Sequence, residues 1–313
     1  MVKIVLKKLA KWLAIAVGAL SIALVAMWWC HRPAHSDPTV SIGSLERYKT
    51  FQSRYVTPRE VAVWLPEGYH RGDSCDVVYM HDGQMLFDAT TTWNGREWAV
   101  DEVAGSLMAS DSLRRLIVVA INNSGDRLQE YFTDGAWQFL PLAEQSDVDK
   151  DKLLGDEYLR FVVEEVKPFV DSTYCPLGGP EHTFMMGSSM GGLISLYALC
   201  EYPQVFGGVA CLSTHLSMSY VGHGSDKRHW QDALLNYLAA RLPAAGSHRV
   251  YMDHGTEGLD AEYAIPQQRV DSLFAARGWD TSHYMSRVYT GHDHTESDWA
   301  RRLDVPFLFM LSN

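Results

Sequence analysis

A serine flanked by glycines is the feature that most constrains how this chain can fold. The motif Gly187-Ser188-Ser189-Met190-Gly191-Gly192 follows an apolar run at residues 183–186 and precedes an apolar helical pattern at residues 193–200. Glycines permit a sharp strand-to-helix turn that holds the serine in a strained conformation, where larger neighbours would clash. The turn also places Ser189 near a helix N-terminus, where developing negative charge is stabilised. The motif therefore predicts a nucleophilic serine.

The rest of the chain alternates short β-like runs with longer helical patterns. Runs that favour strands lie at residues 61–65, 77–81, 116–121, 183–186, 208–212, 250–252 and 284–288. Helical patterns lie at residues 95–109, 151–172, 191–201, 229–241, 261–277 and 295–311. Several runs are apolar throughout, which is typical of parallel strands covered on both faces. We therefore predict an α/β fold with a mostly parallel central sheet and helices on both faces.

The first 36 residues differ in composition from the remainder. Four lysines lie within the first eleven positions, an apolar run follows at residues 12–29, and the segment has no acidic residue. A helix over this run would be about 27 Å long, close to the ~30 Å of bilayer hydrocarbon. We expect a transmembrane anchor in the inner membrane, with a cleaved signal peptide as the alternative. Both place the rest of the chain outside the cytoplasm, in the periplasm.

The remaining sequence predicts a linker and one catalytic domain. We assign residues 1–36 to the anchor or signal segment, residues 37–58 to a polar linker, and residues 59–313 to an α/β-hydrolase domain. Beyond residue 36 the chain carries 22 basic and 38 acidic side chains, a net charge of about −16. A surface this acidic does not favour contacts with phosphates, so we expect no nucleic-acid partner.

A serine hydroxyl needs a general base to become a nucleophile. In hydrolases with this serine turn, the chain order is serine, acid and then histidine. The segment after the last predicted strand, residues 291–299, contains His292 and His294, and position alone leaves both open. A His-x-His metal pair is the alternative, but no cysteine or third histidine lies nearby in sequence to complete a zinc site. We therefore do not expect a metal at these histidines.

The acid that orients the histidine is expected in the loop after residues 250–252. Asp253, Glu257 and Asp260 are the candidates there. Asp253 lies close to the strand and suits a turn, whereas Asp260 lies deeper in the loop and can bend toward the histidine. Asp260 also suits the N-cap of a helix that begins near residue 261. We favour Asp260, and Glu257, Asp253 or no acid remain alternatives.

Two backbone N–H groups are needed to stabilise the oxyanion of a tetrahedral intermediate. Met190 directly follows the serine, so its N–H is one candidate. The other is expected in the loop after an early strand, where His81-Asp82-Gly83-Gln84 ends the run at residues 77–81. We select the N–H of Gln84, because Gly83 frees the backbone to point inward. We interpret His81 as a packed histidine at a strand end.

These motifs resemble those of the putative esterase family of α/β hydrolases, which includes enterochelin esterases, esterase D, feruloyl esterases and mycolyltransferases. The resemblance covers residues 45–312 and rests on residues 81–88, the serine turn with the downstream Tyr202-Pro203, and residues 291–299. The last stretch is similar to the family pattern G-x-x-H-x-E-x-x-W, which implies His294 as the base. The resemblance also supports Gln84 as an oxyanion donor. It places Arg127 near the pocket, either paired with a substrate carboxylate or in a surface salt bridge.

The resemblance implies hydrolysis of carboxylic esters without a metal or organic cofactor. We predict a serine esterase that forms an acyl-enzyme on Ser189, with His294 as base and Asp260 as acid. The expected substrate is a small ester, such as a siderophore or acyl-sugar ester. One alternative is an acyltransferase with the same triad, and another is a membrane-tethered binding protein without catalytic activity.

Overall fold

The computed structural model describes residues 37–146, 148–218 and 227–313. The predicted anchor or signal segment at residues 1–36, with its apolar run at 12–29, lies outside the described residues. Within the described ranges, no helix is both long enough and apolar enough to cross a bilayer. The membrane segment therefore stays a prediction from the sequence.

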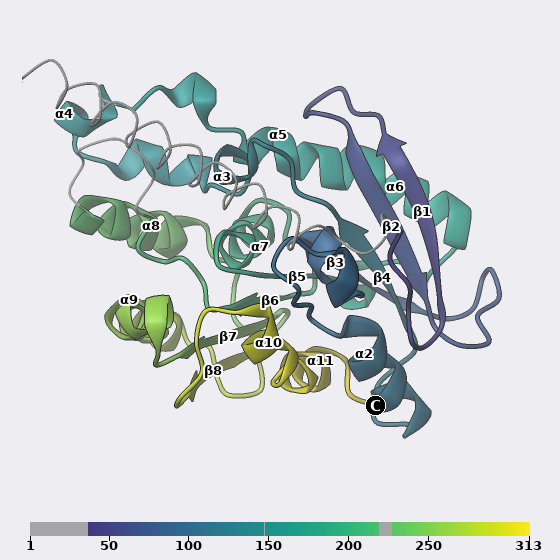
Figure 1. Cartoon of the computed structure of the whole chain (residues 1–313). Coiled ribbons are helices and arrows are strands. Elements are labelled where there is room, and N and C mark those ends of the chain that lie inside the picture. The colour runs from purple at the N-terminus through teal and green to yellow at the C-terminus, as the bar shows by residue number, and fades with distance from the viewer. Residues whose placement is uncertain (1–36, 147, 219–226) are drawn as a thin grey trace, which may run out of the picture.

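One eight-stranded sheet forms the centre of the described chain (Figure 1). The strands are β1 Ser44–Phe51, β2 Arg59–Leu65, β3 Asp76–His81, β4 Leu116–Ile121, β5 Thr183–Ser188, β6 Gly208–Leu212, β7 Arg249–Gly255 and β8 Tyr284–Tyr289. Their spatial order is β1-β2-β4-β3-β5-β6-β7-β8. The two pairs that involve β2 are antiparallel, and every pair from β4 to β8 is parallel. The predicted mostly parallel sheet is confirmed.

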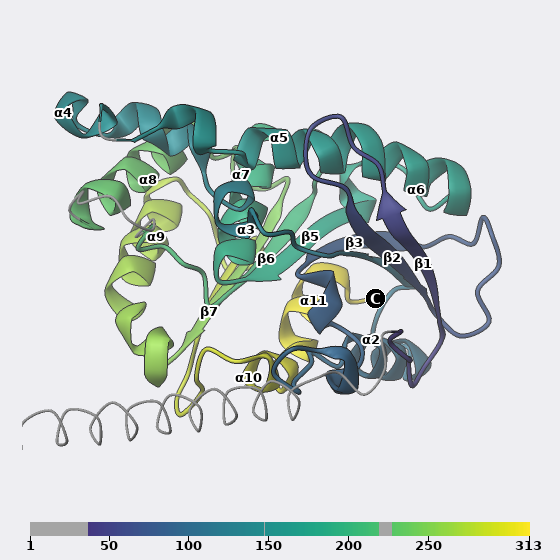
Figure 2. The ribbon, with the colours of Figure 1, turned by 45° about the horizontal axis from the view of Figure 1, so that its top comes forward.

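Helices cover both faces of this sheet (Figure 2). The α-helices are α2 Val100–Ala109, α3 Arg127–Glu130, α4 Leu142–Gln145, α5 Gly155–Arg160, α6 Lys167–Tyr174, α7 Met190–Glu201, α8 Lys227–Arg241, α9 Ala264–Ala276, α10 Glu296–Ala300 and α11 Asp304–Leu311. Side chains of α5 to α9 join one apolar cluster, and those of α2, α10 and α11 join a second. The predicted two-sided cover is confirmed.

The strands divide their side chains between the two clusters with a period of two. In β4, Ile117 and Val119 join the cluster under α5 to α9, whereas Val118 and Ala120 join the other. All four are fully buried. Successive side chains point to opposite faces of a strand, so a strand that is covered on both faces must be apolar at every position.

The linker predicted over residues 37–58 is wrong in part, because Ser44–Phe51 forms strand β1 at the edge of the sheet. It pairs antiparallel with β2, from Ser44 opposite Leu65 to Phe51 opposite Arg59. Its side chains are exposed or half-buried, and none is fully buried. An edge strand with solvent on one side needs no continuous apolar run, which explains its polar sequence.

The chain before β1 is hydrogen-bonded to the segment between β3 and α2. Asp88 accepts hydrogen bonds from the N–H and the hydroxyl of Thr39, each at 2.9 Å. In α2, the Asp101 carboxylate accepts from the N–H groups of Ser41 at 2.6 Å and Ile42 at 3.2 Å. These contacts fix the start of the described chain against residues 82–101, part of which lines the cavity described next.

Candidate active site

Ser189 lies on a sharp turn between β5 and α7. Its φ of 56° and ψ of −121° place a non-glycine residue in a sparsely populated region of backbone space. The glycines serve close packing: a Cβ on Gly187 would lie 2.7 Å from the carbonyl carbon of Gly191, and one on Gly192 would lie 2.6 Å from Thr214 Oγ1. The predicted strained turn is therefore present, and the strain lies at the serine itself.

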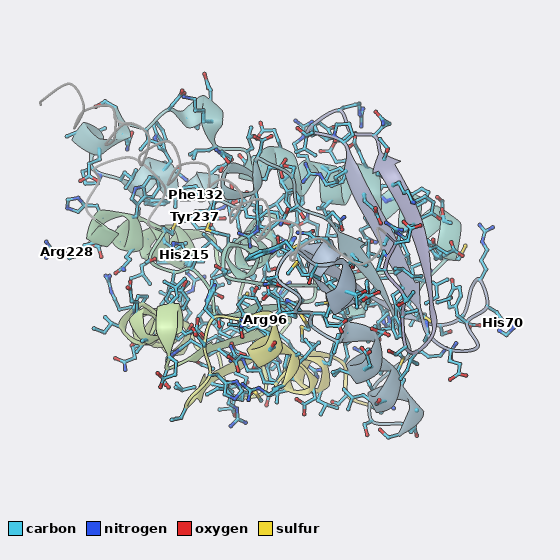
Figure 3. All side chains as sticks on the ribbon, in the orientation of Figure 1. His70, Arg96, Phe132, His215, Arg228 and Tyr237 are labelled. Carbon is cyan, nitrogen blue, oxygen red and sulfur yellow. The ribbon has the colours of Figure 1, made fainter. Side chains whose placement is uncertain are left out.

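Ser189 lines a cavity of about 290 Å³ at the carboxyl ends of the parallel strands. The other lining residues are Asp82, Gln84, Met85, Trp93, Trp98, Asn123, Arg127, Ser188, His294, Glu296 and Trp299. The loop at residues 92–99, which carries two of these tryptophans, lies beside α10, where Asn94 Nδ2 donates to Glu296 Oε2 at 2.9 Å. Arg96 of this loop is labelled next to α10 in Figure 3.

His294 and Asp260 form a hydrogen-bonded pair at the cavity wall. His294 Nδ1 lies 2.6 Å from Asp260 Oδ1. A proton on Nδ1 that is donated to the carboxylate leaves Nε2 available as a base. Asp260 is fully buried, and burial raises its pKa. Hydrogen bonds from His294, Ser213 and the Gly255 N–H outweigh burial and bring the pKa of Asp260 below its ordinary value, so the carboxylate stays charged.

The structure shows which of the candidate acids lies beside which of the two candidate histidines. Glu257 is exposed at the start of the 3₁₀ helix η7, Gly258–Glu262. Asp253 is buried, and its Oδ1 pairs with Arg302 Nη2 at 2.9 Å. His292 Nδ1 lies 3.3 Å from Arg302 Nη1. Of the candidate acids, the structure therefore brings Asp260 to His294. Their catalytic roles stay predictions.

The two predicted oxyanion donors lie in the first turns of helices. Met190 is the first residue of α7, and Gln84 is the middle residue of the 3₁₀ helix η1, Gly83–Met85. Backbone N–H groups in a first turn have no acceptor within their own helix, so they can donate to an oxyanion. Gln84 lines the cavity, and Met190 adjoins Ser189, which does. The arrangement suits the predicted role and does not by itself test it.

The turn after β3 needs Gly83 for packing and not for its backbone angles. Asp82 takes the left-handed conformation, with φ 55° and ψ 44°. A Cβ on Gly83 would lie 2.7 Å from the carbonyl carbon of Ala120 in β4. The reason given from the sequence, that Gly83 frees the backbone, is therefore wrong. Close packing of η1 against β4 is the physical cause.

Arg127 lines the cavity, but Asp82 engages its guanidinium. Arg127 Nε and Nη2 lie 2.7 and 2.8 Å from the two oxygens of that carboxylate. Asn123 Nδ2 also donates to Asp82, at 2.6 Å. Burial raises the pKa of Asp82, but Arg127 together with the Asn123 hydrogen bond lowers it further, so the pKa lies below its ordinary value. The ion-pair interpretation fits this geometry, and the pair holds the turn that carries Gln84.

Two other histidines, His81 and His215, lie near the candidate site. His81 is buried, its Nδ1 lies 2.8 Å from the Tyr158 hydroxyl, and burial lowers its pKa to about 3. It is a neutral packed histidine, as interpreted from the sequence. The second histidine, His215, is labelled in Figure 3, and its Nδ1 lies 3.0 Å from the Tyr263 hydroxyl oxygen. The Tyr263 ring meets the His294 ring edge-on, with centroids 5.7 Å apart.

The hydrogen-bond partners of Asp260 were not predicted from the sequence. Ser213 Oγ lies 2.5 Å from Asp260 Oδ2, and the Gly255 N–H donates to the same oxygen at 2.7 Å. Ser213 directly follows β6, between the strands that precede Ser189 and Asp260. Residues at the carboxyl ends of neighbouring parallel strands gather at one edge of a sheet. That rule was the available signal for Ser213.

The fold and this site define an α/β hydrolase. A serine on a strand–helix turn after β5, an acid after β7 and a histidine after β8 follow the chain order of that class. Residues 53–310 match the model of the family described as "Putative esterase". The chain belongs to this family and is an esterase.

The chain is also similar to individual proteins. Over 217 residues the chain is 26% identical to the uncharacterized protein YbbA of Bacillus subtilis (strain 168), with 69% of this chain and 72% of that protein covered. Over 148 residues it is 30% identical to a siderophore enterobactin esterase of Emericella nidulans, with 46% of this chain but only 47% of that protein covered.

Solved structures show the same fold at lower identity. A ferulic acid esterase matches with a TM-score of 0.62 and 18% identity, over 86% of this chain and 98% of that one. The enterobactin esterase FES from Shigella flexneri matches with a TM-score of 0.61 and 18% identity, over 89% of this chain and 62% of that one. At this level of identity the likeness establishes the fold, and the substrate remains to be argued from the site.

Proposed function

We propose that this esterase hydrolyses small carboxylic esters through an acyl-enzyme on Ser189. The observation that carries the proposal is the 2.6 Å contact between His294 Nδ1 and Asp260 Oδ1 at the cavity that Ser189 lines. His294 Nε2 takes the hydroxyl proton as Ser189 Oγ attacks the ester carbonyl. His294 then protonates the leaving alcohol, and water releases the acid from the enzyme by the same two steps.

Fixed charges and dipoles supply most of the stabilisation in this scheme. The ionised Asp260 stabilises the imidazolium that forms on His294 during attack. The N–H groups of Gln84 and Met190 stabilise the oxyanion, and they need no reorganisation because η1 and α7 already hold them. No step requires a metal or an organic cofactor.

We propose that the ester carries a planar ring. Three tryptophans line the cavity, and the Trp98 and Trp299 rings lie 5.2 Å apart between centroids. Trp93 also lines the cavity and is 71% exposed, so it presents a broad apolar face to an incoming group. Aromatic side chains favour flat apolar partners in stacked or edge-on contacts. The enterobactin and ferulic acid esterases among the relatives make those esters the first to test.

A substrate screen of the full chain tests this function. Enterobactin, a feruloyl ester, an acetylated sugar and a nitrophenyl ester are each incubated with enzyme, with and without a sugar alcohol as acceptor. We expect free acid from a ring-bearing ester, and a mass increase by one acyl group on the peptide that contains Ser189 at early times. Products acylated on the acceptor in place of free acid would indicate an acyltransferase. No turnover and no labelling of Ser189 by a fluorophosphonate would contradict both.

We further propose that the enzyme acts outside the cytoplasm, held at the inner membrane by residues 12–29. The lysine-rich start and the apolar run support this orientation. The full chain is expected to stay with membranes after alkaline extraction and to be degraded by protease added to spheroplasts. Protection of the full chain in intact spheroplasts, with degradation only after lysis, would contradict the proposal.

A further inference from the structure

Ser213 lies between the proposed acid and a buried ion pair. Its Oγ is 2.5 Å from Asp260 Oδ2, 2.9 Å from Trp299 Nε1 and 2.8 Å from Arg302 Nη2. Arg302 is itself held by Asp253, with Nη2 at 2.9 Å from Oδ1 and Nε at 3.1 Å from Oδ2. Ser213, Asp253 and Asp260 are fully buried, and Arg302 is 1% exposed.

The chemistry of its partners fixes the direction in which Ser213 donates. The indole N–H of Trp299 and the guanidinium of Arg302 can only donate hydrogen bonds. Together they occupy the two lone pairs of the Ser213 hydroxyl. The single hydroxyl proton must therefore point to Asp260 Oδ2, which also accepts from the Gly255 N–H at 2.7 Å.

Arg302 forms an ion pair with the acid, but its hydrogen-bonded connection to the acid runs through this serine. Its Nη2 lies 3.8 Å from Asp260 Oδ2, beyond hydrogen-bond distance. With Oδ2 held by Ser213 and Gly255, Oδ1 of Asp260 is directed at His294. The two hydrogen bonds to Oδ2 oppose rotation of the carboxylate away from the imidazole.

The backbone holds Ser213 in place at a conformational cost. Its φ is 42°, a left-handed conformation that non-glycine residues rarely adopt. Its N–H donates to Asp253 twice, to the carbonyl at 2.9 Å and to Oδ1 at 3.1 Å. Strained conformations persist where the surrounding structure over-determines them, and they cluster at functional sites.

We propose that Ser213 is a positioning residue of the esterase: it holds Asp260 aligned with His294, and the buried Asp253–Arg302 pair fixes the direction of its hydrogen bond. The inference rests on the proposed function of Ser189, His294 and Asp260. It also assigns a role to Asp253. This residue holds Arg302 in place and so affects Asp260 only indirectly.

A double-mutant cycle on the full chain tests the role. We measure kcat and KM for a nitrophenyl ester in the wild type, Ser213→Ala, Asp260→Ala and the double variant. Ser213→Ala is expected to lower kcat by about 10- to 100-fold with little change in KM, since a hydrogen bond to a charged group is lost. In the Asp260→Ala background the same change is expected to have no further effect, because Ser213 acts through Asp260.

Two further variants keep the test decisive. Ser213→Cys retains the shape with a weaker donor and is expected to give an intermediate kcat; it replaces Ser213→Ala in the cycle if the alanine variant does not fold. Ser195→Ala is the matched control, since Ser195 is also buried and its Oγ donates to the Gly191 carbonyl within α7 at 2.7 Å. This control is expected to keep the wild-type kcat.

The outcomes separate this inference from the proposed function. An unchanged kcat in folded Ser213→Ala, or an equal loss in both backgrounds, would overturn the positioning role while leaving the function of the acid intact. Full activity in Asp260→Ala would instead overturn the proposed triad, and with it the role of Ser213.

Discussion

Replacement of Ser189 by alanine is expected to lower kcat for ester hydrolysis by about 10⁶-fold and to abolish labelling by a fluorophosphonate. The physical reason is that the hydroxyl forms the acyl-enzyme, and without it only the oxyanion donors and substrate binding remain to accelerate attack by water. Hydrolysis of a nitrophenyl ester by the purified variant measures the effect. Activity close to that of the wild type would show that Ser189 is not the nucleophile.

Ser189→Gly provides a matched variant for this test. Glycine also lacks the hydroxyl, but it accepts the φ of 56° and ψ of −121° that strain a side-chain-bearing residue. Glycine relieves this strain, but its greater flexibility in the unfolded chain offsets part of the gain. The free energy of unfolding of Ser189→Gly should therefore be about 1 kcal/mol higher than that of Ser189→Ala. Both variants should be equally inactive. Thermal unfolding at one scan rate compares them.

Asp260→Asn is expected to lower kcat by about 10³- to 10⁴-fold with little change in KM. The amide keeps the size of the carboxylate but carries no charge to stabilise the imidazolium on His294. It can also present an N–H to His294 Nδ1, which favours the wrong tautomer of the ring. Steady-state kinetics on the same nitrophenyl ester measure the loss.

Glu257→Gln is the control for the acid. Glu257 lies in the same loop, was a candidate from the sequence, and is exposed. The same removal of a carboxylate charge there is expected to leave kcat unchanged. If Glu257→Gln lost activity while Asp260→Asn retained it, the assignment of the acid would have to move to Glu257.

The central strands could be predicted from the sequence because the sheet is covered on both faces. Every residue of β4, Leu116–Ile121, is buried, so its apolar run carries the full signal. Strand β1 could not be predicted in this way. It lies at the edge of the sheet, its side chains are exposed or half-buried, and its sequence resembles a linker.

Candidate site residues could be proposed from the sequence where the signals are local. Ser189 stands in a short motif whose spacing carries the chemistry, whereas His294 was chosen over His292 only from the resemblance to the family pattern. Asp260 could only be favoured over Glu257, because the path of one 3₁₀ helix decides which carboxylate turns inward. Contacts between distant segments were beyond reach: Asp82 engages Arg127 from 45 residues away, and Ser213 meets Arg302 across 89.

The hydrogen bonds that Thr39 makes to Asp88, in the segment between β3 and α2, bear on where the enzyme meets its substrate. That same segment carries Trp93 at the cavity. Nine residues, 30–38, separate Thr39 from the proposed membrane helix, and even fully extended they span at most about 32 Å. With residues 12–29 in the bilayer, this attachment would keep the mouth of the candidate pocket close to the lipid headgroups. Substrate would then be taken from the layer of solution next to the membrane surface.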